Sequence, residues 1–409
     1  MIRIYIRPLA VMLGIFSIVT VEILPIGLLT PIAEEFDISE GTAGLTMTLP
    51  GLLAAVSAPL VILAVGKIDR RTVLYSMMFL LAVADFLAAV APSYWVMLLS
   101  RVIVGITIGG FWSLSAGLAQ QLVEERHVTA ATSLIFSAVP LGSVLGVPLG
   151  TLVGNVWGWR SAFAVVGVFT LAVFVLLIAV IPSLPPDHAI TGRMLRKGLV
   201  APGSIAGVVI TAFVVLAHFG AYTYIEPFLG QIGEFSHGGI TTLLLIYGAA
   251  GVIGNFAIGK LMANHHRFGF GIGAALIGVS VAGLALAGGQ QVFIVLALVV
   301  WGFAYGGVPV ASNTWIAKNP RIAPEVASVL FTAPFQATIS IGALVGGVIV
   351  DSSGVVTVMW ASAGTAGVAT IVIAAVSLLA ARGQTVKGKD IDRVTSVSST
   401  EVPAERSAR

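Results

Sequence analysis

Apolar residues run almost unbroken along this chain, in stretches long enough to cross a membrane. Twelve such stretches can be placed, at residues 9–31, 44–65, 73–91, 95–122, 129–154, 161–181, 202–228, 239–260, 269–287, 292–316, 326–350 and 356–380. A helix needs about 20 apolar residues to cross the hydrocarbon core of a bilayer. Lipid offers the backbone no hydrogen-bond partners, so only helices and closed barrels can cross it. The runs lack the two-residue alternation of barrel strands, which leaves helices. The sequence therefore predicts an all-α integral membrane protein with twelve transmembrane helices.

The composition agrees with a membrane protein. Hydrophobic residues make up 57% of the chain and charged residues 10%, against about 25% charged residues in an ordinary soluble domain. The chain has no cysteine, so disulfides and thiolate sites are excluded. The sequence pI near 9.3 reflects the charges of the loops, and we expect a lipid bilayer and a small molecule as partners, with no nucleic acid.

Polar segments divide the chain into two halves and a tail. A proline-broken stretch that begins at Pro182 separates the sixth and seventh apolar runs. The chain turns to Lys, Asp, Ser and Thr after Arg382, which is typical of a solvated, disordered segment. The predicted organisation is an N-terminal six-helix bundle over 1–182, a cytoplasmic linker over 183–200, a C-terminal six-helix bundle over 201–381 and a disordered cytoplasmic tail over 382–409.

Loop charges predict the orientation in the membrane. With a cytoplasmic N-terminus, Arg160 is the one basic residue in the predicted outer loops, out of 21 Lys and Arg in the chain. Basic loops stay on the cytoplasmic side. The first outer loop is instead acidic, with Glu34, Glu35, Asp37 and Glu40. We expect a multi-pass protein with both termini in the cytoplasm.

Several features of the first half return in the second, about 200 residues later. They are Gly105 with Gly109-Gly110 against Gly302 with Gly306-Gly307, Ser133–Ala138 against Ser328–Ala333, and Glu22 before Pro25 against Glu226 before Pro227. A shared offset indicates duplication. The sequence therefore predicts two pseudo-symmetric six-helix bundles, an arrangement that transporters use for rocking around a central site.

Three ionisable side chains are predicted at one depth within the apolar runs: Glu22, Asp85 and Arg101. Charges in lipid are expensive and mark functional sites. Arg101 can neutralise one carboxylate, which leaves the other to hold a proton when buried and release it when water arrives. The three are candidates for proton coupling, with Glu22 foremost; alternatively, Asp85 and Arg101 form a purely structural pair. Glu226, near an outer end, is interpreted as a charge at the level of the lipid headgroups.

Glycine and proline residues mark sites of helix packing and gating. Gly142, Gly146, Gly150 and Gly154 recur every four residues, which leaves one helix face nearly bare. Such a face forms a close packing seam, and its partner could also slide along it. The predicted packing and gating residues are Pro25, Gly105, Gly109, Gly142, Gly146, Pro148 and Gly150.

Aromatic and polar residues within the spans indicate a ligand cavity. The candidates are Phe111, Trp112, Ser115, His218, Tyr222, Tyr224, Asn313, Trp315 and Gln336. Aromatic faces with few hydrogen-bonding groups suit planar, partly apolar ligands. The two tyrosines could instead belong to an interfacial belt, and His218 could be a structural residue. No catalytic or metal-binding constellation is recognised, so we expect no enzyme and no cofactor, with protons as the coupling ion.

These motifs resemble the major facilitator superfamily, and within it the twelve-helix drug:proton antiporters that include efflux transporters of purine ribonucleosides and sugars. The resemblance covers residues 9–381 and rests on Val21–Pro25, Leu28–Pro31, Ile38–Gly41, Arg101–Gly105, Gly109–Trp112, Trp159-Arg160 with Phe163, Thr223–Ile225 with Pro227, and Val308–Val310 with Thr314-Trp315. It implies that the protein lies in the bacterial inner membrane, that Glu22 and Arg101 take part in proton coupling, and that the substrate lies between the halves.

The chain departs from the family pattern in two places. The loop after the second span keeps Arg70 and Arg71, while the family's Gly-Asp-Gly positions match Ile62, Gly66 and Asp69. The antiporter motif of the fifth span, normally an adjacent Gly-Pro, here reads Gly146-Val147-Pro148. The first departure leaves open whether Asp69 has a gating role, and the second leaves the direction of transport open.

Together these features predict a proton-coupled secondary active transporter that exports a small organic solute, a purine nucleoside or a drug-like planar molecule, and that functions as a monomer. Two alternatives remain at this point. A proton-linked importer would use the same residues in the opposite direction, and a non-transporting membrane receptor would bind the solute without moving it.

Overall fold

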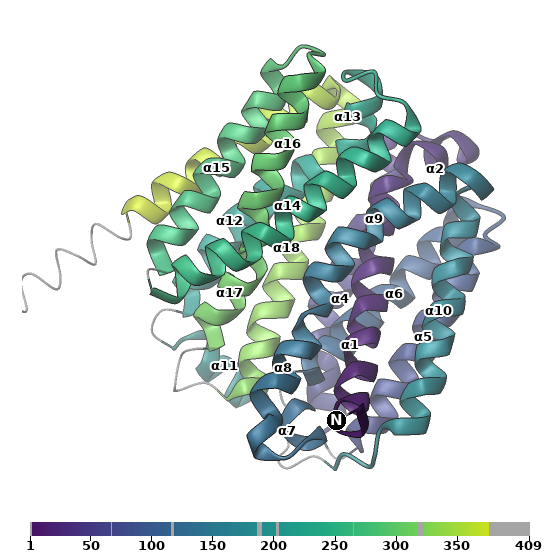
Figure 1. Cartoon of the computed structure of the whole chain (residues 1–409), viewed down its shortest axis with the longest axis vertical. Coiled ribbons are helices and arrows are strands. Elements are labelled where there is room, and N and C mark those ends of the chain that lie inside the picture. Colours follow the sequence, from purple (N-terminus) through teal and green to yellow (C-terminus); the bar gives the residue numbers. More distant parts are fainter. Residues whose placement is uncertain are drawn as a thin grey trace, which may run out of the picture.

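The computed structural model describes residues 2–66, 68–115, 118–185, 190–201, 204–264, 266–317 and 323–375, and every regular element in these ranges is helical (Figure 1). The elements are α1 (Ile2–Ile23), η1 (Leu24–Gly27), α2 (Leu29–Phe36), α3 (Glu40–Ala43), α4 (Leu45–Ala64), α5 (Arg70–Ala89), α6 (Tyr94–Ser115), α7 (Leu118–Leu122), η2 (Glu125–His127), α8 (Val128–Phe136), α9 (Ala138–Trp157), α10 (Trp159–Val180), α11 (Gly192–Leu199), α12 (Ser204–Tyr222), α13 (Ile225–Gln231), α14 (His237–Asn264), α15 (His266–Leu286), α16 (Gln291–Gly306), α17 (Val308–Ala317) and α18 (Pro324–Ser353). A last helix follows over Val355–Ala375. The predicted tail lies outside these ranges.

The prediction of twelve spans is confirmed. Within the described ranges, eleven helices are long and apolar enough to cross a membrane. The fifth predicted span is the twelfth crossing, and it is broken into α8 and α9, whose apolar part Val144–Trp157 is shorter. Pro140 stands in the first turn of α9, and proline has no backbone N–H with which to continue the hydrogen bonding of the preceding helix. The first and seventh spans are also interrupted, beside Pro25 and Pro227.

The duplication is visible in the backbone. Among the described residues, only Asp37 and Glu234 adopt positive φ without being glycine, at 53° and 52°. Gly158 and Gly354 both have φ 83° and end α9 and α18. Each pair is about 200 residues apart, like the sequence repeats. The two halves therefore share turns in an unusual conformation, as expected for one fold used twice.

The repeated glycines perform the same task in each half. A Cβ atom at Gly105 would overlap the carbonyl oxygen of Pro50 on α4, and one at Gly302 would overlap that of Tyr247 on α14. Only glycine lets two backbones approach this closely. The fourth span of each half thus packs directly on the second span, α6 on α4 and α16 on α14. The glycine repeat specifies this contact.

The glycine stripe of α9 is a packing seam, and its partner is the first span. Added Cβ atoms would lie 2.8 Å from Val19 at Gly142 and 3.2 Å from the Thr20 Cα at Gly146, and would meet Leu24 at Gly150. The seam therefore presses α1 and η1 against α9 within the N-terminal half.

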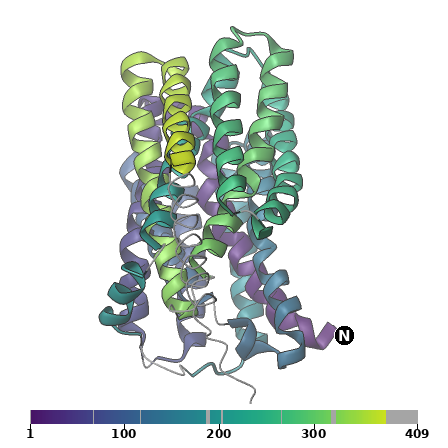
Figure 2. The same cartoon turned by 90° about the vertical axis from the view of Figure 1, so that its left-hand side faces the viewer.

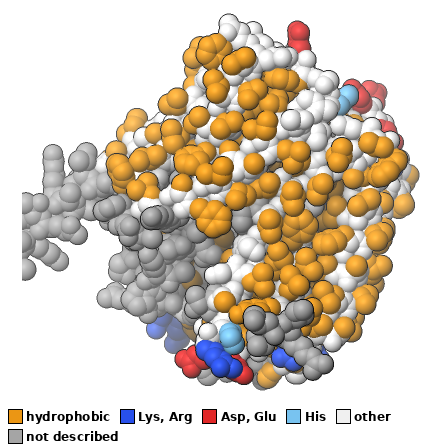
Figure 3. Space-filling model, in the orientation of Figure 1, with side chains coloured by type: hydrophobic (Ala, Val, Ile, Leu, Met, Phe, Trp, Pro, Cys, Tyr) orange, Lys and Arg blue, Asp and Glu red, His pale blue; other side chains and the backbone are white. Residues whose placement is uncertain are grey.

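The surface is apolar around the middle and charged at the ends. Figure 3 shows hydrophobic side chains over most of the visible face, acidic side chains at the end that carries α2, and Lys and Arg at the opposite end, near α7 and α11. Large side chains such as Phe256 and Trp95 are 73% and 80% exposed, as expected for helices facing lipid. We call the two ends the acidic end and the basic end. Figure 2 shows the N-terminus at the basic end.

Candidate functional site

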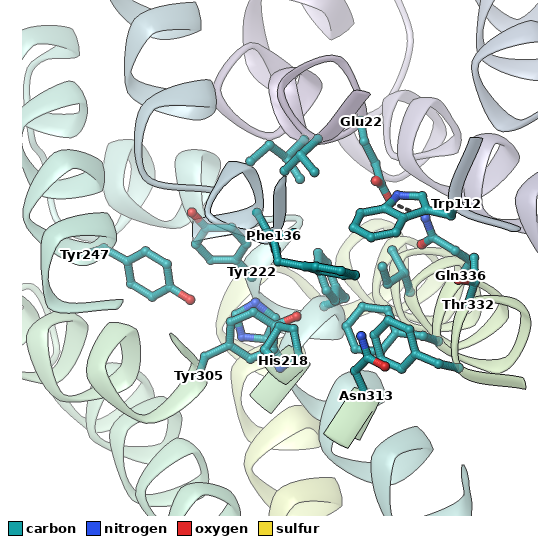
Figure 4. A pocket seen from close by; sticks show the side chains of 18 residues that line it. Glu22, Trp112, Phe136, His218, Tyr222, Tyr247, Tyr305, Asn313, Thr332 and Gln336 are labelled. Carbon is teal, nitrogen blue, oxygen red and sulfur yellow. Dashed lines mark hydrogen bonds between the residues drawn. The ribbon is translucent and has the colours of Figure 1, made fainter. Parts of the chain in front are cut away.

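A cavity of about 150 Å³ lies where the two halves meet. Its wall comes from α1, α6, α8 and α9 of the first half and from α12, α14, α16, α17 and α18 of the second. The lining residues are Val19, Glu22, Ile23, Trp112, Phe136, Val139, His218, Phe219, Tyr222, Tyr247, Tyr305, Pro309, Asn313, Phe331, Thr332, Phe335, Gln336 and Ile339 (Figure 4). The lining is largely apolar and aromatic with a few polar groups, which is typical of a small-molecule site.

Glu22 is joined across this cavity to the other half of the protein. Its Oε1 accepts a hydrogen bond of 2.8 Å from Nε2 of Gln336 on α18, drawn in Figure 4. The Glu22 residue is 8% exposed and Gln336 is 4% exposed. A carboxyl group buried this deeply is costly unless it is hydrogen-bonded or neutral. The amide of Gln336 is the one hydrogen-bond partner of this carboxyl among the described residues.

Arg101 reaches the turn of α1 that holds Glu22. Its Nη1 donates to the carbonyl oxygen of Val21 at 3.2 Å, and its guanidinium carbon lies 4.9 Å from the ring centre of Phe163. Pro25 lacks the N–H that would otherwise donate to the Val21 carbonyl in a regular helix. The break at Pro25 therefore leaves the Val21 carbonyl free to accept, and Arg101 hydrogen-bonds to it beside Glu22.

Asp85 lies behind the cavity, between α5 and α10. One oxygen, Oδ2, accepts from Thr170 Oγ1 at 3.2 Å, and the other, Oδ1, is buried without a hydrogen-bond partner. Nη2 of Arg101 is also buried without one. Asp85 and Arg101 interact electrostatically, but no hydrogen bond joins them in this structure. Of the three predicted coupling residues, Glu22 is the one that lines the cavity.

The second half contributes an aromatic wall centred on His218. The imidazole stacks on Tyr305 with ring centres 3.4 Å apart, and Nδ1 accepts a hydrogen bond of 3.0 Å from Nε1 of Trp301. Because Nδ1 is an acceptor, the hydrogen of this neutral ring belongs on Nε2. Tyr222 and Tyr247 continue the stack, with ring centres 4.7 Å apart. The arrangement offers flat faces rather than a proton relay.

Three buried polar atoms among the lining residues have no hydrogen-bond partner. They are the hydroxyl of Tyr247, Oγ1 of Thr332 and Oε1 of Gln336. Their residues are 6%, 3% and 4% exposed. Buried polar groups in native proteins are nearly always paired, so unpaired ones at a cavity wall mark places where a ligand or water belongs.

Five of the predicted cavity residues line the cavity: Trp112, His218, Tyr222, Asn313 and Gln336. Three do not, and for these the prediction was wrong. Phe111 points into the first half, where its ring lies 3.0 Å from a Cβ built on Gly14. The hydroxyl of Tyr224 donates to the carbonyl of Ala343 at 2.7 Å, and Trp315 packs on Phe270 with ring centres 5.6 Å apart. The side chain of Ser115 lies outside the described residues.

Sequence reasoning missed several lining residues, and the signal for some was present. Thr332, Phe335 and Ile339 follow the helical face of Gln336, at intervals of three and four residues that place side chains together. Tyr247 and Tyr305 are polar aromatic residues in the middle of apolar runs. Their position beside the glycines that bring α14 and α16 together became informative only with the structure.

The two halves are joined at the acidic end by a set of hydrogen bonds that we call the acidic-end seam. Glu226 accepts from Thr30 through Oγ1 at 2.6 Å and through the backbone N–H at 3.2 Å. Glu40 accepts from Gln231 at 2.9 Å. Further bonds of the seam are Ser39 Oγ and Gly41 N to Asp351, Asn155 Nδ2 to Thr241 Oγ1, and Thr241 Oγ1 to Thr151 Oγ1.

The interpretation of Glu226 as a headgroup-level charge is thereby corrected. This residue is 5% exposed, because Pro227 and the α12–α13 break turn it inward against the first half. A further hydrogen bond between the halves lies away from the seam and the cavity. Ser328 Oγ donates it to the carbonyl oxygen of Trp112, at 2.9 Å. The structure is therefore closed at the acidic end.

Two further acids, outside the spans, hold loops within the first half. Burial raises the pKa of Glu35, but hydrogen bonds from Arg160 and Trp159 outweigh this, so its pKa lies below the usual carboxyl value. Asp69 behaves likewise: burial raises its pKa, and hydrogen bonds from Ser183 Oγ and the Leu184 N–H bring it below the usual value. In this structure Asp69 anchors the start of the linker, rather than bridging the two halves.

Comparisons with known proteins agree with this architecture. A model of the Major Facilitator Superfamily matches residues 11–333. The purine ribonucleoside efflux pump NepI of Salmonella paratyphi B (strain ATCC BAA-1250 / SPB7) is 30% identical over 366 residues, covering 90% of this chain and 92% of the pump. NepI of Salmonella typhi matches with the same identity and coverage.

Solved structures share the fold. A bacterial homologue of the human lysosomal transporter Spinster, in an inward-facing and occupied conformation, has a TM-score of 0.71 at 17% identity, covering 92% of this chain and 96% of that one. A POT family transporter in complex with a thioalcohol-conjugated peptide has a TM-score of 0.73 at 11% identity, covering 91% of this chain and 96% of that one. At these identities the likeness concerns the fold alone.

Proposed function

The chain belongs to the major facilitator superfamily, and from that premise we propose that it is a proton-coupled carrier that exports a small organic solute by alternating access. In each cycle the solute leaves the cell while a proton enters. Glu22 carries the proton, and the cavity between the halves holds the solute. A purine nucleoside or a similar planar molecule is the leading substrate.

The single observation that carries this proposal is the position of Glu22. Its carboxyl group is buried at the cavity between the halves and is bonded to Gln336 of the opposite half. A carboxyl that is desolvated in one arrangement and meets water in another changes its affinity for protons. Movement of the halves would break the bond to Gln336 and change the solvation of Glu22. Arg101, bonded to Val21 next to Glu22, is proposed to respond to the same movement.

The substrate class follows from the lining of the cavity. Among its described residues there is no Lys or Arg to pair with a phosphate or carboxylate, whereas the stacked aromatic side chains suit a planar ring. An uncharged nucleoside satisfies both conditions, and an anionic nucleotide does not. The similarity to NepI, a purine ribonucleoside efflux pump, supports the same class.

Loop charges support the proposed orientation. The acidic end, with Glu34 and Asp37, is assigned to the outside, and the basic end to the cytoplasm. With this assignment both termini are cytoplasmic, the protein lies in the inner membrane, and the described arrangement is closed to the outside. The cavity lies within a single chain, so a monomer is sufficient for the cycle.

Transport in inside-out membrane vesicles tests the proposal. An acidic lumen is expected to drive accumulation of radiolabelled inosine by the wild-type protein. Glu22→Gln removes the titratable proton but keeps the size of the side chain, so it is expected to abolish this accumulation while labelled-for-unlabelled exchange continues. Glu34→Gln, at an exposed acid of the acidic end, is the matched control and should behave as the wild type.

Three outcomes would contradict the proposal. Gradient-driven accumulation that persists in Glu22→Gln would remove Glu22 from the coupling role. Higher inosine accumulation in intact cells that express the protein would favour a proton-linked importer. Inosine binding without counterflow in sealed proteoliposomes would favour a receptor.

A further inference from the structure

The side-chain amide of Gln336 has two polar groups, and only one of them has a hydrogen-bond partner. Its Nε2 donates to Glu22 at 2.8 Å, while its Oε1 is buried without a hydrogen-bond partner. Figure 4 shows the amide at the wall of the cavity beside Glu22 and close to Thr332. A buried amide oxygen without a donor is unfavourable. The cavity therefore presents an acceptor that is ready for an N–H or O–H group of a bound solute.

A side-chain amide suits both forms of a carboxyl. Its NH₂ group donates to a carboxylate, as it does here, and its oxygen accepts from a protonated carboxyl. A half-turn of the amide exchanges the two ends. With the NH₂ group toward Glu22, the oxygen is free for the solute; with the oxygen toward protonated Glu22, the NH₂ group faces the cavity and repels a donor.

We propose, on the basis of the proposed function, that Gln336 makes the solute and the proton exclude one another. A solute that donates a hydrogen bond to Oε1 holds the amide in the orientation that supports ionised Glu22. A proton on Glu22 draws the amide oxygen away and releases the solute. The orientation of one rotatable amide thus depends on both the solute and the proton. This dependence is the condition for exchange of one against the other.

The other ionisable groups near Glu22 do not hydrogen-bond to its carboxyl group. The titratable side chains that share the cavity with Glu22 are His218, Tyr222, Tyr247 and Tyr305. Behind α1, Arg101 bonds to the Val21 carbonyl and Asp85 to Thr170. Among the helices packed on α1, α4, α8 and α9 contain no Asp, Glu, Lys, Arg or His, and α10 contains only Arg160 at the acidic end. None of these groups hydrogen-bonds to the Glu22 carboxyl, so a change at Gln336 acts on it directly.

The two other unpaired groups extend the description of the solute. The hydroxyls of Thr332 and Tyr247 are buried and can each donate or accept. They lie on different helices, Thr332 on α18 and Tyr247 within the aromatic wall on α14. The preferred solute therefore combines a flat uncharged ring, a donor for Gln336 and further polar groups for these hydroxyls. A ring bearing amino or hydroxyl groups meets this requirement, and a plain hydrocarbon does not.

Inosine binding to the purified full-length protein in lipid nanodiscs tests the inference. For the wild type, affinity is expected to fall about tenfold from mildly alkaline to mildly acidic pH, within the usual range of coupling between two ligands. Binding is also expected to release protons into a weakly buffered solution. Gln336→Met keeps the length of the side chain without its polar atoms. It should bind inosine about three- to tenfold more weakly, with no pH dependence and no proton release.

Gln120→Met is the matched control, because Gln120 is an exposed glutamine of α7 that lies outside the cavity lining and the acidic-end seam. It should retain the pH dependence and the proton release. If Gln336→Met does not fold, Gln336→Leu replaces it. Retention of the pH dependence and proton release in the folded Gln336 variant overturns the inference. So does a wild type whose binding is independent of pH although a proton gradient drives its transport. Absence of gradient-driven transport in the wild type overturns the proposed function itself.

Discussion

Replacing Thr30 by valine tests whether the acidic-end seam holds the protein closed on that side. Thr30 Oγ1 donates to Glu226 at 2.6 Å, and the two residues belong to opposite halves. Valine keeps the branched shape of threonine and removes only the hydroxyl. The backbone N–H of residue 30 still reaches Glu226, at 3.2 Å in the wild type. The substitution therefore removes one charge-assisted hydrogen bond that exists only while the acidic end is closed.

The size of the effect follows from this bond. A hydrogen bond to a charged group contributes about 1.5–3 kcal/mol, and about 1.4 kcal/mol corresponds to a tenfold change in an equilibrium constant. Removing the Thr30 hydroxyl should shift the equilibrium between closed and open acidic ends by about ten- to a hundredfold toward the open state. Glu226 is buried, so solvent screening reduces this little.

Spin-label distances measure the shift directly, because the chain contains no cysteine and introduced cysteines are the sole labelling sites. Ser93 and Gln290 are exposed in turns at the acidic end of the first and second halves. Labels at Ser93→Cys and Gln290→Cys should give one distance population in the wild-type background and a second, longer population with Thr30→Val. Thr242→Val is the control, because the exposed Thr242 hydroxyl bonds within its own helix. An unchanged distance distribution with Thr30→Val would refute the reasoning.

Two further predictions concern packing and pH. Gly302→Ala should lower the melting temperature by the equivalent of about 1–3 kcal/mol, since its Cβ would overlap the Tyr247 carbonyl; Gly364→Ala, where a Cβ meets nothing within 4 Å, should be neutral or stabilising. Glu35→Gln should lower the melting temperature at neutral pH because it loses the ion pair with Arg160. The wild-type advantage depends on the lowered pKa of Glu35, so it should be present above the ordinary carboxyl value of about 4.3 and vanish as pH falls through the lower value. A melting-temperature difference that stays constant down to strongly acid pH would contradict this.

Hydrophobic runs predicted the helices well because lipid permits no other regular backbone for them. The interruptions were harder to predict. Pro25 and Pro140 fall at or next to breaks, whereas Pro148 lies inside an unbroken α9. A proline in the interior of a helix removes one hydrogen bond, and whether the helix continues depends on which neighbouring group replaces it. For the Val21 carbonyl that group is Arg101, eighty residues away in the sequence.

The candidate site shows the same division. The polar residues Glu22 and Gln336 stood out within apolar runs, because their burial in lipid would be too costly without a partner, and both line the cavity. The rotation of each helix about its axis decides whether a side chain faces the cavity or the core. This rotation could not be predicted from the sequence of a single span. Phe111 and Trp112 are neighbours in the chain, yet a step of about 100° around the helix places only Trp112 in the cavity. Such a choice depends on both halves together.

The position of α1 explains why the carboxyl group that matters is on this helix. The glycines of α9 hold α1 within the first half, where a Cβ atom at Gly146 would lie only 3.2 Å from the Thr20 Cα. Glu22 on this same helix is bonded to Gln336 of the second half. A movement of one half against the other therefore carries α1 with α9 and must break or remake the Glu22–Gln336 bond. Glu22, the side chain proposed to carry the proton, is thus fixed to the first half and hydrogen-bonded to the second. Its surroundings therefore change whenever the halves rock.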